Sequence, residues 1–136
     1  MNIDERSRNT AKILIDIGAI NFSLVTPFRL SSGFLSPSYI DCRKIIAYPS
    51  AFKSITDMMI DTIKSDMDSH SPNYIIGGET AGIPFGAVIA EKMGLPLSYV
   101  RKKAKDYGRS KLIEGDIFKE KNSLLVELSL IHISEP

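Results

Sequence analysis

The 136-residue sequence has few features of a secreted, membrane-spanning or disulfide-stabilised protein. Its single cysteine, Cys42, cannot form an internal disulfide, which favours a reducing cytoplasm. No apolar run approaches the roughly 20 residues that a membrane-spanning helix needs. Residues 1–6 lack the basic-then-apolar pattern of a secretory signal. Internal repeats and low-complexity tracts are also missing, so we expect one soluble cytoplasmic domain.

The charge of the chain is concentrated in one segment. Hydrophobic residues make up 43% and charged residues 24%, which is ordinary for a globular protein. Residues 101–111 hold six basic side chains and one acid, a local charge of +5 in a chain of net charge +1, so the remainder carries −4. A positive patch on a mildly acidic body fits a compact anionic ligand better than a nucleic acid. The basic residues are Arg101, Lys102, Lys103, Lys105, Arg109 and Lys111.

The first half of the chain predicts two helices separated by short extended pieces. Apolar spacing over residues 4–17 indicates an amphipathic helix, and Gly18 can supply its left-handed cap. Between residues 19 and 42, short apolar stretches alternate with proline, serine and glycine, which predicts a small irregular lobe. Pro49 then opens a second helix that should run to about Asp66.

The second half predicts an α/β sheet. Residues 74–76 and 97–100 read as apolar strands on either side of a helix over residues 83–93. A third strand is expected at residues 123–126. Strand, helix, strand, loop and strand at this spacing favour a parallel sheet with right-handed crossovers.

Two segments could carry chemistry. The glycine-rich stretch at residues 77–82 lies where a strand turns into a helix, which is where open α/β sheets bind ligands. It matches neither the dinucleotide nor the nucleoside-triphosphate motif, and Glu79 is an awkward neighbour for a bare phosphate. The basic segment at residues 101–111 can be a solvated charge run or a nucleic-acid patch. Its start at the end of a buried strand favours a loop that grips a polyphosphate. His70 lies near no set of metal ligands.

Three stretches together resemble the orotate phosphoribosyltransferase family. Residues 100–108, followed by 112–115, are similar to that family's catalytic loop. Residues 28–33 with 36–41 resemble its N-terminal substrate segment, and residues 77–84 resemble its strand-to-helix loop. The three occur in the family's order within residues 4–127, which is more specific than any one motif.

The resemblance implies an incomplete type I phosphoribosyltransferase fold, with a parallel core sheet, flanking helices and a small N-terminal hood. It implies transfer of ribose 5-phosphate from phosphoribosyl pyrophosphate to orotate in a cytoplasmic homodimer, with Mg²⁺ held mainly by the phosphoribosyl substrate and not directly by protein. The basic segment would be shared between subunits, with neither nucleic acid nor membrane as partner. The implied catalytic residues are Lys105, Arg101 and Lys102. The implied substrate-binding residues are Tyr107, Glu127, Ser31, Tyr39, Ile40, Thr80 and Ala81. Tyr107 stands where many members have histidine.

The sequence departs from the family pattern after Glu127. A second acid and a threonine- and glycine-rich phosphate loop are expected there, but residues 128–136 differ. These nine residues resemble the translation of CTG TCT CTT ATA CAC ATC TCC GAG CCC, a transposase adapter. We therefore interpret residues 1–127 as the N-terminal part of the domain and 128–136 as a non-native tail, and expect the 136-residue chain itself to be inactive. The alternatives are a nucleotide-sensing regulator with this fold and a small basic nucleic-acid-binding protein.

Overall fold

A computed structural model describes residues 2–30, 32–67, 71–103, 112–116 and 122–128 of the chain. The fold divides into two compact units, residues 1–55 and 56–136, with the boundary inside one helix. Within the described residues, none of the helices combines the length and apolar character needed to cross a bilayer.

The first unit begins with helix α1 (Ile3–Asp16), which confirms the first predicted helix. Asn2 caps its start, because the side-chain oxygen accepts a hydrogen bond of 2.8 Å from the backbone N–H of Glu5. Gly18 has a φ of 63°, the left-handed conformation expected of the residue that ends this helix. The Lys44 ammonium donates to the Gly18 carbonyl at 3.0 Å, which places a cation at the negative end of α1.

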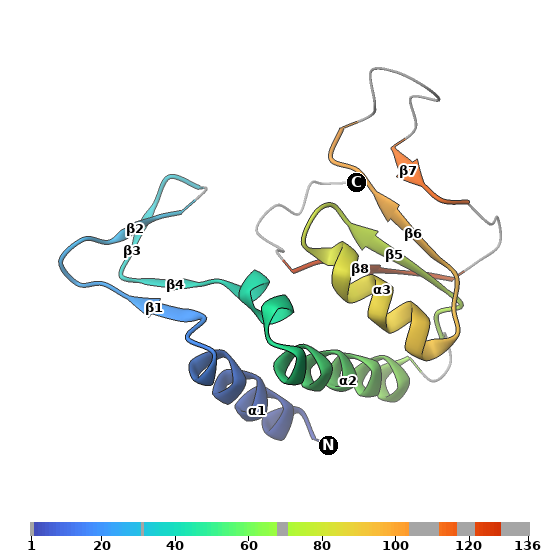
Figure 1. The fold of residues 1–136 in the computed structure, drawn as a ribbon, viewed down its shortest axis with the longest axis horizontal. Helices are drawn as coiled ribbons and strands as arrows, with labels where there is room; N and C mark the ends of the chain where they lie inside the picture. The colour runs from blue at the N-terminus through green and yellow to red at the C-terminus, as the bar shows by residue number, and fades with distance from the viewer. Residues whose placement is uncertain (1, 31, 68–70, 104–111, 117–121, 129–136) are drawn as a thin grey trace. The chain divides into compact units, whose positions relative to one another are not determined.

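The rest of the first unit is the irregular lobe that the sequence predicts. Four short strands pair as two antiparallel ladders, β1 with β4 and β2 with β3 (Figure 1). Their bounds are β1 Ile20–Phe22, β2 Phe28–Arg29, β3 Leu35–Ser36 and β4 Ser38–Ile40. A 3₁₀ helix (Cys42–Ala47) follows, and α2 (Pro49–Asp66) confirms the second predicted helix.

The second unit is built on a four-stranded sheet in the order β7-β6-β5-β8 (Figure 1). Its strands are β5 Tyr74–Gly78, β6 Leu97–Val100, β7 Ile113–Glu114 and β8 Ser123–Val126. Strand β5 is parallel to both β6 and β8, as predicted, with Gly78 opposite Val100 and Gly77 opposite Val126. Strand β7, which the apolar pattern does not indicate, pairs antiparallel with β6.

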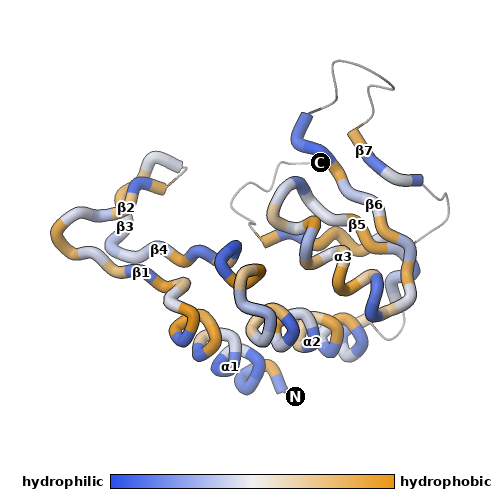
Figure 2. The backbone as a smooth tube through the Cα atoms, in the orientation of Figure 1, coloured by the Kyte–Doolittle hydropathy of each residue, from blue (hydrophilic) through white to orange (hydrophobic). Residues whose placement is uncertain are grey.

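Helix α3 (Gly82–Met93) connects β5 to β6 and carries much of the core. Phe85 and Ile89 on α3 and Ile75 on β5 are fully buried, and Figure 2 shows apolar residues along both elements. The helix lies close to the sheet because glycines meet there: a Cβ on Gly86 would lie 3.3 Å from the Cα of Gly77. This close packing fixes the start of α3 at one edge of the sheet.

Candidate active site

The carboxyl ends of the three parallel strands bring three chain segments to one edge of the sheet. Residues 79–81 follow β5, residues 101–103 follow β6, and residues 127–128 follow β8. This is the edge at which open α/β sheets bind ligands. The structure therefore confirms that the glycine-rich stretch and the start of the basic segment share an edge, and Glu127, also predicted to bind substrate, lies at the same edge.

Glycine allows the glycine-rich stretch and Glu127 to approach closely. Strand β5 continues through Gly78, so the turn is shorter than the predicted residues 77–82. A Cβ on Gly78 would overlap the Glu127 carboxylate, and a Cβ on Gly82 would overlap the Val126 carbonyl oxygen. The Glu127 Oε1 atom accepts the Leu128 N–H at 2.8 Å.

Thr80 and Ala81 occupy the turn between β5 and α3. Thr80 is exposed and Ala81 is half-buried. The peptide bond before Thr80 is cis, and the Thr80 carbonyl accepts the Ile83 N–H at 3.3 Å. Both predicted substrate-binding residues therefore lie at the same sheet edge as Glu127 and the start of the basic segment.

Glu79 contacts the basic segment. Its backbone N–H donates to the Val100 carbonyl at 2.9 Å, and its side-chain Oε2 accepts the Lys102 backbone N–H at 2.8 Å. The Glu79 carboxylate, which would repel a nearby phosphate, thus accepts a hydrogen bond from the backbone. The sequence alone does not reveal this contact, because it depends on the register between β5 and β6.

The start of the basic segment is also held from the β7 side. The Arg101 N–H donates to the Leu112 carbonyl at 2.7 Å. The Arg101 guanidinium lies 3.8 Å from the Glu114 carboxylate, with about a quarter to a third of each side chain exposed. Figure 2 shows the hydrophilic stretch that follows β6. The predicted catalytic residue Lys105 and the predicted substrate-binding residue Tyr107 lie outside the described residues.

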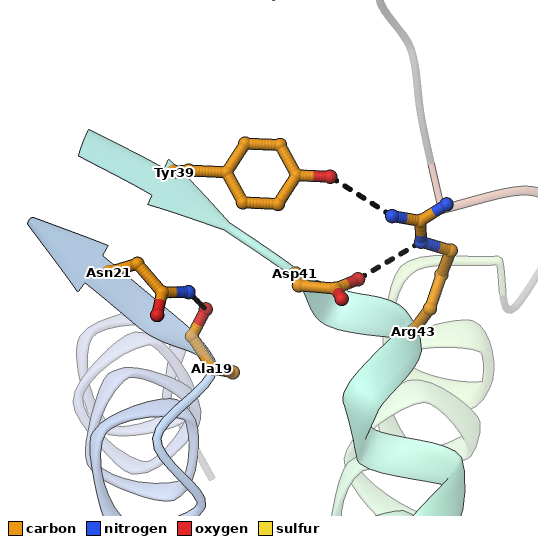
Figure 3. Close-up of polar contacts among 5 residues, drawn as sticks. All are labelled: Ala19, Asn21, Tyr39, Asp41 and Arg43. Carbon is orange, nitrogen blue, oxygen red and sulfur yellow. Dashed lines mark hydrogen bonds and ion pairs between the residues drawn. The ribbon is translucent and has the colours of Figure 1, made fainter. Parts of the chain in front are cut away.

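The first unit holds the remaining predicted residues. Tyr39 lies on β4 with its ring centroid 5.8 Å from that of Phe28. Its hydroxyl accepts a 3.0 Å hydrogen bond from Arg43, whose Nε donates to Asp41 at 2.9 Å (Figure 3). Ile40 is 53% exposed. Ser31 lies outside the described residues.

Arg43 is not singled out by the sequence analysis. The hydrogen bond from Arg43 to Asp41 and the charge of that carboxylate raise the pKa of the arginine, so it stays cationic. No simple spacing marks the contact in the sequence, because Arg43 lies in the 3₁₀ helix (Cys42–Ala47) and Tyr39 lies in strand β4. The three side chains form one polar cluster, and one of them, Tyr39, is already predicted to bind substrate.

Among the described residues, the Cys42 thiol is not activated as a nucleophile and no metal-binding cluster is found. Burial, helped by the Asp41 charge, raises the pKa of the Cys42 thiol, which keeps it protonated at neutral pH. Among the residues that the structure describes, no group of three His, Cys, Asp or Glu side chains is arranged to hold a metal ion.

The chain is similar to curated bacterial proteins over most of its length. It is 48% identical over 123 residues to an orotate phosphoribosyltransferase of Roseobacter denitrificans, covering 90% of this chain and 55% of the relative. The corresponding protein of a Ruegeria species is 47% identical over 124 residues, covering 91% of this chain and 55% of that protein. The chain thus spans about half the length of these relatives. No protein-family model matches it.

Solved structures agree with the sequence relatives. The Leishmania donovani UMP synthase matches 86% of this chain and 24% of its own, with a TM-score of 0.65 and 28% identity. The Aeropyrum pernix orotate phosphoribosyltransferase matches 69% of this chain and 54% of its own, with a TM-score of 0.58 and 32% identity. These matches show that the chain has a type I phosphoribosyltransferase fold. Within that class, the chain is similar to orotate phosphoribosyltransferases over nine-tenths of its length.

Proposed function

We propose that the protein to which this chain belongs is an orotate phosphoribosyltransferase. It transfers ribose 5-phosphate from phosphoribosyl pyrophosphate to orotate, releasing pyrophosphate and giving orotidine 5′-monophosphate for UMP synthesis. The observation that carries the proposal is the 48% identity to a protein of that name across 90% of this chain. The sheet edge that joins residues 79–81, 101–103 and 127–128 supports it.

The chemistry requires positive charge beside the departing pyrophosphate. The bond from ribose C1 to the pyrophosphate oxygen breaks, and its electron pair leaves with the pyrophosphate. A bond from C1 to orotate N1 forms, and the proton of N1 passes to a phosphate oxygen or to water. The sugar becomes cationic in the transition state, as in glycoside cleavage, while negative charge grows on the leaving group. Cationic side chains placed where that charge develops stabilise the transition state. Arg101 and Lys102 lie at the carboxyl edge of the sheet, where such cations are required.

We assign the remaining roles from the family resemblance. Lys105 binds the pyrophosphate together with Arg101 and Lys102, and Tyr107 contributes to substrate binding. Glu127 contacts the ribose hydroxyls, and Thr80 and Ala81 contact substrate at the turn. Tyr39 and Ile40 flank the orotate ring, and Ser31 contacts the phosphoribosyl substrate.

Mg²⁺ enters the proposal as an ion carried mainly by phosphoribosyl pyrophosphate. Mg²⁺ keeps several waters and binds readily through substrate phosphates, so no direct protein ligand is required. When bound, the ion neutralises charge on the pyrophosphate. We further propose a cytoplasmic homodimer in which residues 101–111 serve both subunits, with neither nucleic acid nor membrane as a partner.

A chimeric protein tests the proposed function. Residues 1–127 would be joined to the remaining part of the Roseobacter denitrificans relative, and orotate-dependent pyrophosphate release would be measured with phosphoribosyl pyrophosphate and Mg²⁺. The unaltered relative serves as the positive control. We expect turnover that requires orotate. A folded chimera that binds nucleotides or RNA but releases no pyrophosphate would contradict the proposal.

A further inference from the structure

We propose that Glu79 is a positioning residue that uses its side-chain oxygen to fix the start of the basic segment. The role deepens the proposed function and rests on it, because Arg101 and Lys102 are the cations placed beside the pyrophosphate. Glu79 itself need not touch the substrate. Its contribution is the hydrogen bond to the Lys102 backbone N–H at 2.8 Å.

The register of the sheet shows what this hydrogen bond replaces. Gly78 pairs with Val100, and the Val100 carbonyl accepts the Glu79 N–H at 2.9 Å. In a parallel ladder continued by one step, the Lys102 N–H would donate to the backbone carbonyl of Glu79. The chain instead leaves the sheet after Gly78, and the Glu79 side chain supplies the acceptor. The ladder is thereby extended past the end of β5.

On its opposite side, the backbone of the basic segment is held by Leu112, the residue before β7. The Arg101 N–H donates to the Leu112 carbonyl at 2.7 Å, while the neighbouring N–H of Lys102 points to Glu79. Two consecutive amides are therefore bonded to residues beside two different strands, Glu79 after β5 and Leu112 before β7. These two hydrogen bonds hold the backbone from which the Arg101 and Lys102 side chains extend. Preorganised charges of this kind are the efficient ones, because misplacement by about 1 Å can cost large factors in rate.

The position and the charge of the Glu79 oxygen can be separated with two substitutions. Glu79→Gln keeps an oxygen acceptor at the same reach and removes the negative charge. Glu79→Asp keeps the charge and withdraws the acceptor by one methylene. A positioning role predicts that the Gln variant resembles the unsubstituted protein and that the Asp variant does not. A purely electrostatic role predicts the reverse.

Amide hydrogen exchange in the 136-residue chain tests the contact without any activity. We expect the Lys102 amide to exchange at least about tenfold faster in Glu79→Asp. The free energy of one charge-assisted hydrogen bond corresponds to a change in the exchange rate of about that size. In Glu79→Gln the change should be smaller than about threefold. The Arg101 amide, which bonds to Leu112, is the internal control. Equal Lys102 exchange in all three proteins would overturn the proposal.

Kinetics of the chimera test the consequence. We expect Glu79→Asp to lower kcat roughly tenfold with the KM for orotate within about twofold, and Glu79→Gln to keep kcat within about threefold. Glu114→Gln, which removes charge beside Arg101 but leaves the Lys102 contact, is the matched control. An inactive unsubstituted chimera refutes the proposed function while the exchange result still decides the contact. An active chimera in which Glu79→Asp keeps full kcat refutes the inference alone.

Discussion

The contact between the start of α3 and the end of β8 makes a quantitative prediction for Gly82. A Cβ at this position would overlap the Val126 carbonyl oxygen and crowd the Glu127 backbone, neither of which is the flexible end of a side chain. Overpacking against atoms that cannot rotate away costs about 1–3 kcal/mol. Because both atom sets are backbone, we place Gly82→Ala near the upper end, at about 2–3 kcal/mol less stable.

Gly86 in the same helix is the matched control. A Cβ there would lie 3.3 Å from the Gly77 Cα, so a shift of a few tenths of an ångström relieves the contact. Alanine also gains about 1 kcal/mol over glycine inside a helix. These opposing effects leave Gly86→Ala within about 1 kcal/mol of the unsubstituted chain. The same substitution on the same helix should therefore give different results.

Urea unfolding followed by far-ultraviolet circular dichroism measures the difference. With an m value of about 2 kcal/mol per molar urea, Gly82→Ala should lower the midpoint by about 1 M or more. Gly86→Ala should change the midpoint by less than about 0.5 M. If Gly82→Ala unfolds at the original midpoint, or if Gly86→Ala is the more destabilised variant, the contact of Gly82 with Val126 does not limit the residue at this position.

Three further predictions concern the polar clusters and the basic segment. The buried Tyr74 hydroxyl forms hydrogen bonds with the Ser98 hydroxyl and the Asp116 carbonyl. Tyr74→Phe should therefore lower the unfolding free energy by about 1–3 kcal/mol. An unchanged urea midpoint would argue against that network. Arg43→Met in the chimera should raise the KM for orotate a few-fold and leave the KM for phosphoribosyl pyrophosphate unchanged, because Arg43 donates a hydrogen bond to the Tyr39 hydroxyl. If Arg43→Met has the same effect in a Tyr39→Phe background, the hydroxyl is not involved. Lys105→Ala should cut kcat by about a hundredfold or more with the urea midpoint unchanged, and full turnover would remove Lys105 from the pyrophosphate site.

Long apolar patterns made much of the fold predictable. The helices α1, α2 and α3 and the strands β6 and β8 follow from apolar spacing and from glycine or proline at their ends. The two-residue strand β7 carries no such pattern, because only its pairing with β6 defines it. Strand β5 extends into Gly77 and Gly78, which resemble a turn in the sequence because glycine is common there.

The site was predictable to the level of segments and not of contacts. Motif order brings residues 77–82 and the start of the basic segment to one sheet edge, and the parallel pairing confirms it. The use of the Glu79 side chain as a ladder acceptor depends on the register of Gly78 with Val100, which residue types do not encode. The bond from Arg43 to Tyr39 likewise depends on the 3₁₀ helix after β4, which apolar spacing does not predict.

Orotate-dependent pyrophosphate release by the chimera of residues 1–127 distinguishes an orotate phosphoribosyltransferase from a protein that shares only its fold. Phosphoribosyl pyrophosphate and Mg²⁺ are supplied in all samples, and orotate is compared with uracil, adenine and no base. We expect pyrophosphate release with orotate well above release in the other three samples, accompanied by formation of orotidine 5′-monophosphate. A folded chimera that releases pyrophosphate equally with every base, or with none, would show that the protein is not an orotate phosphoribosyltransferase.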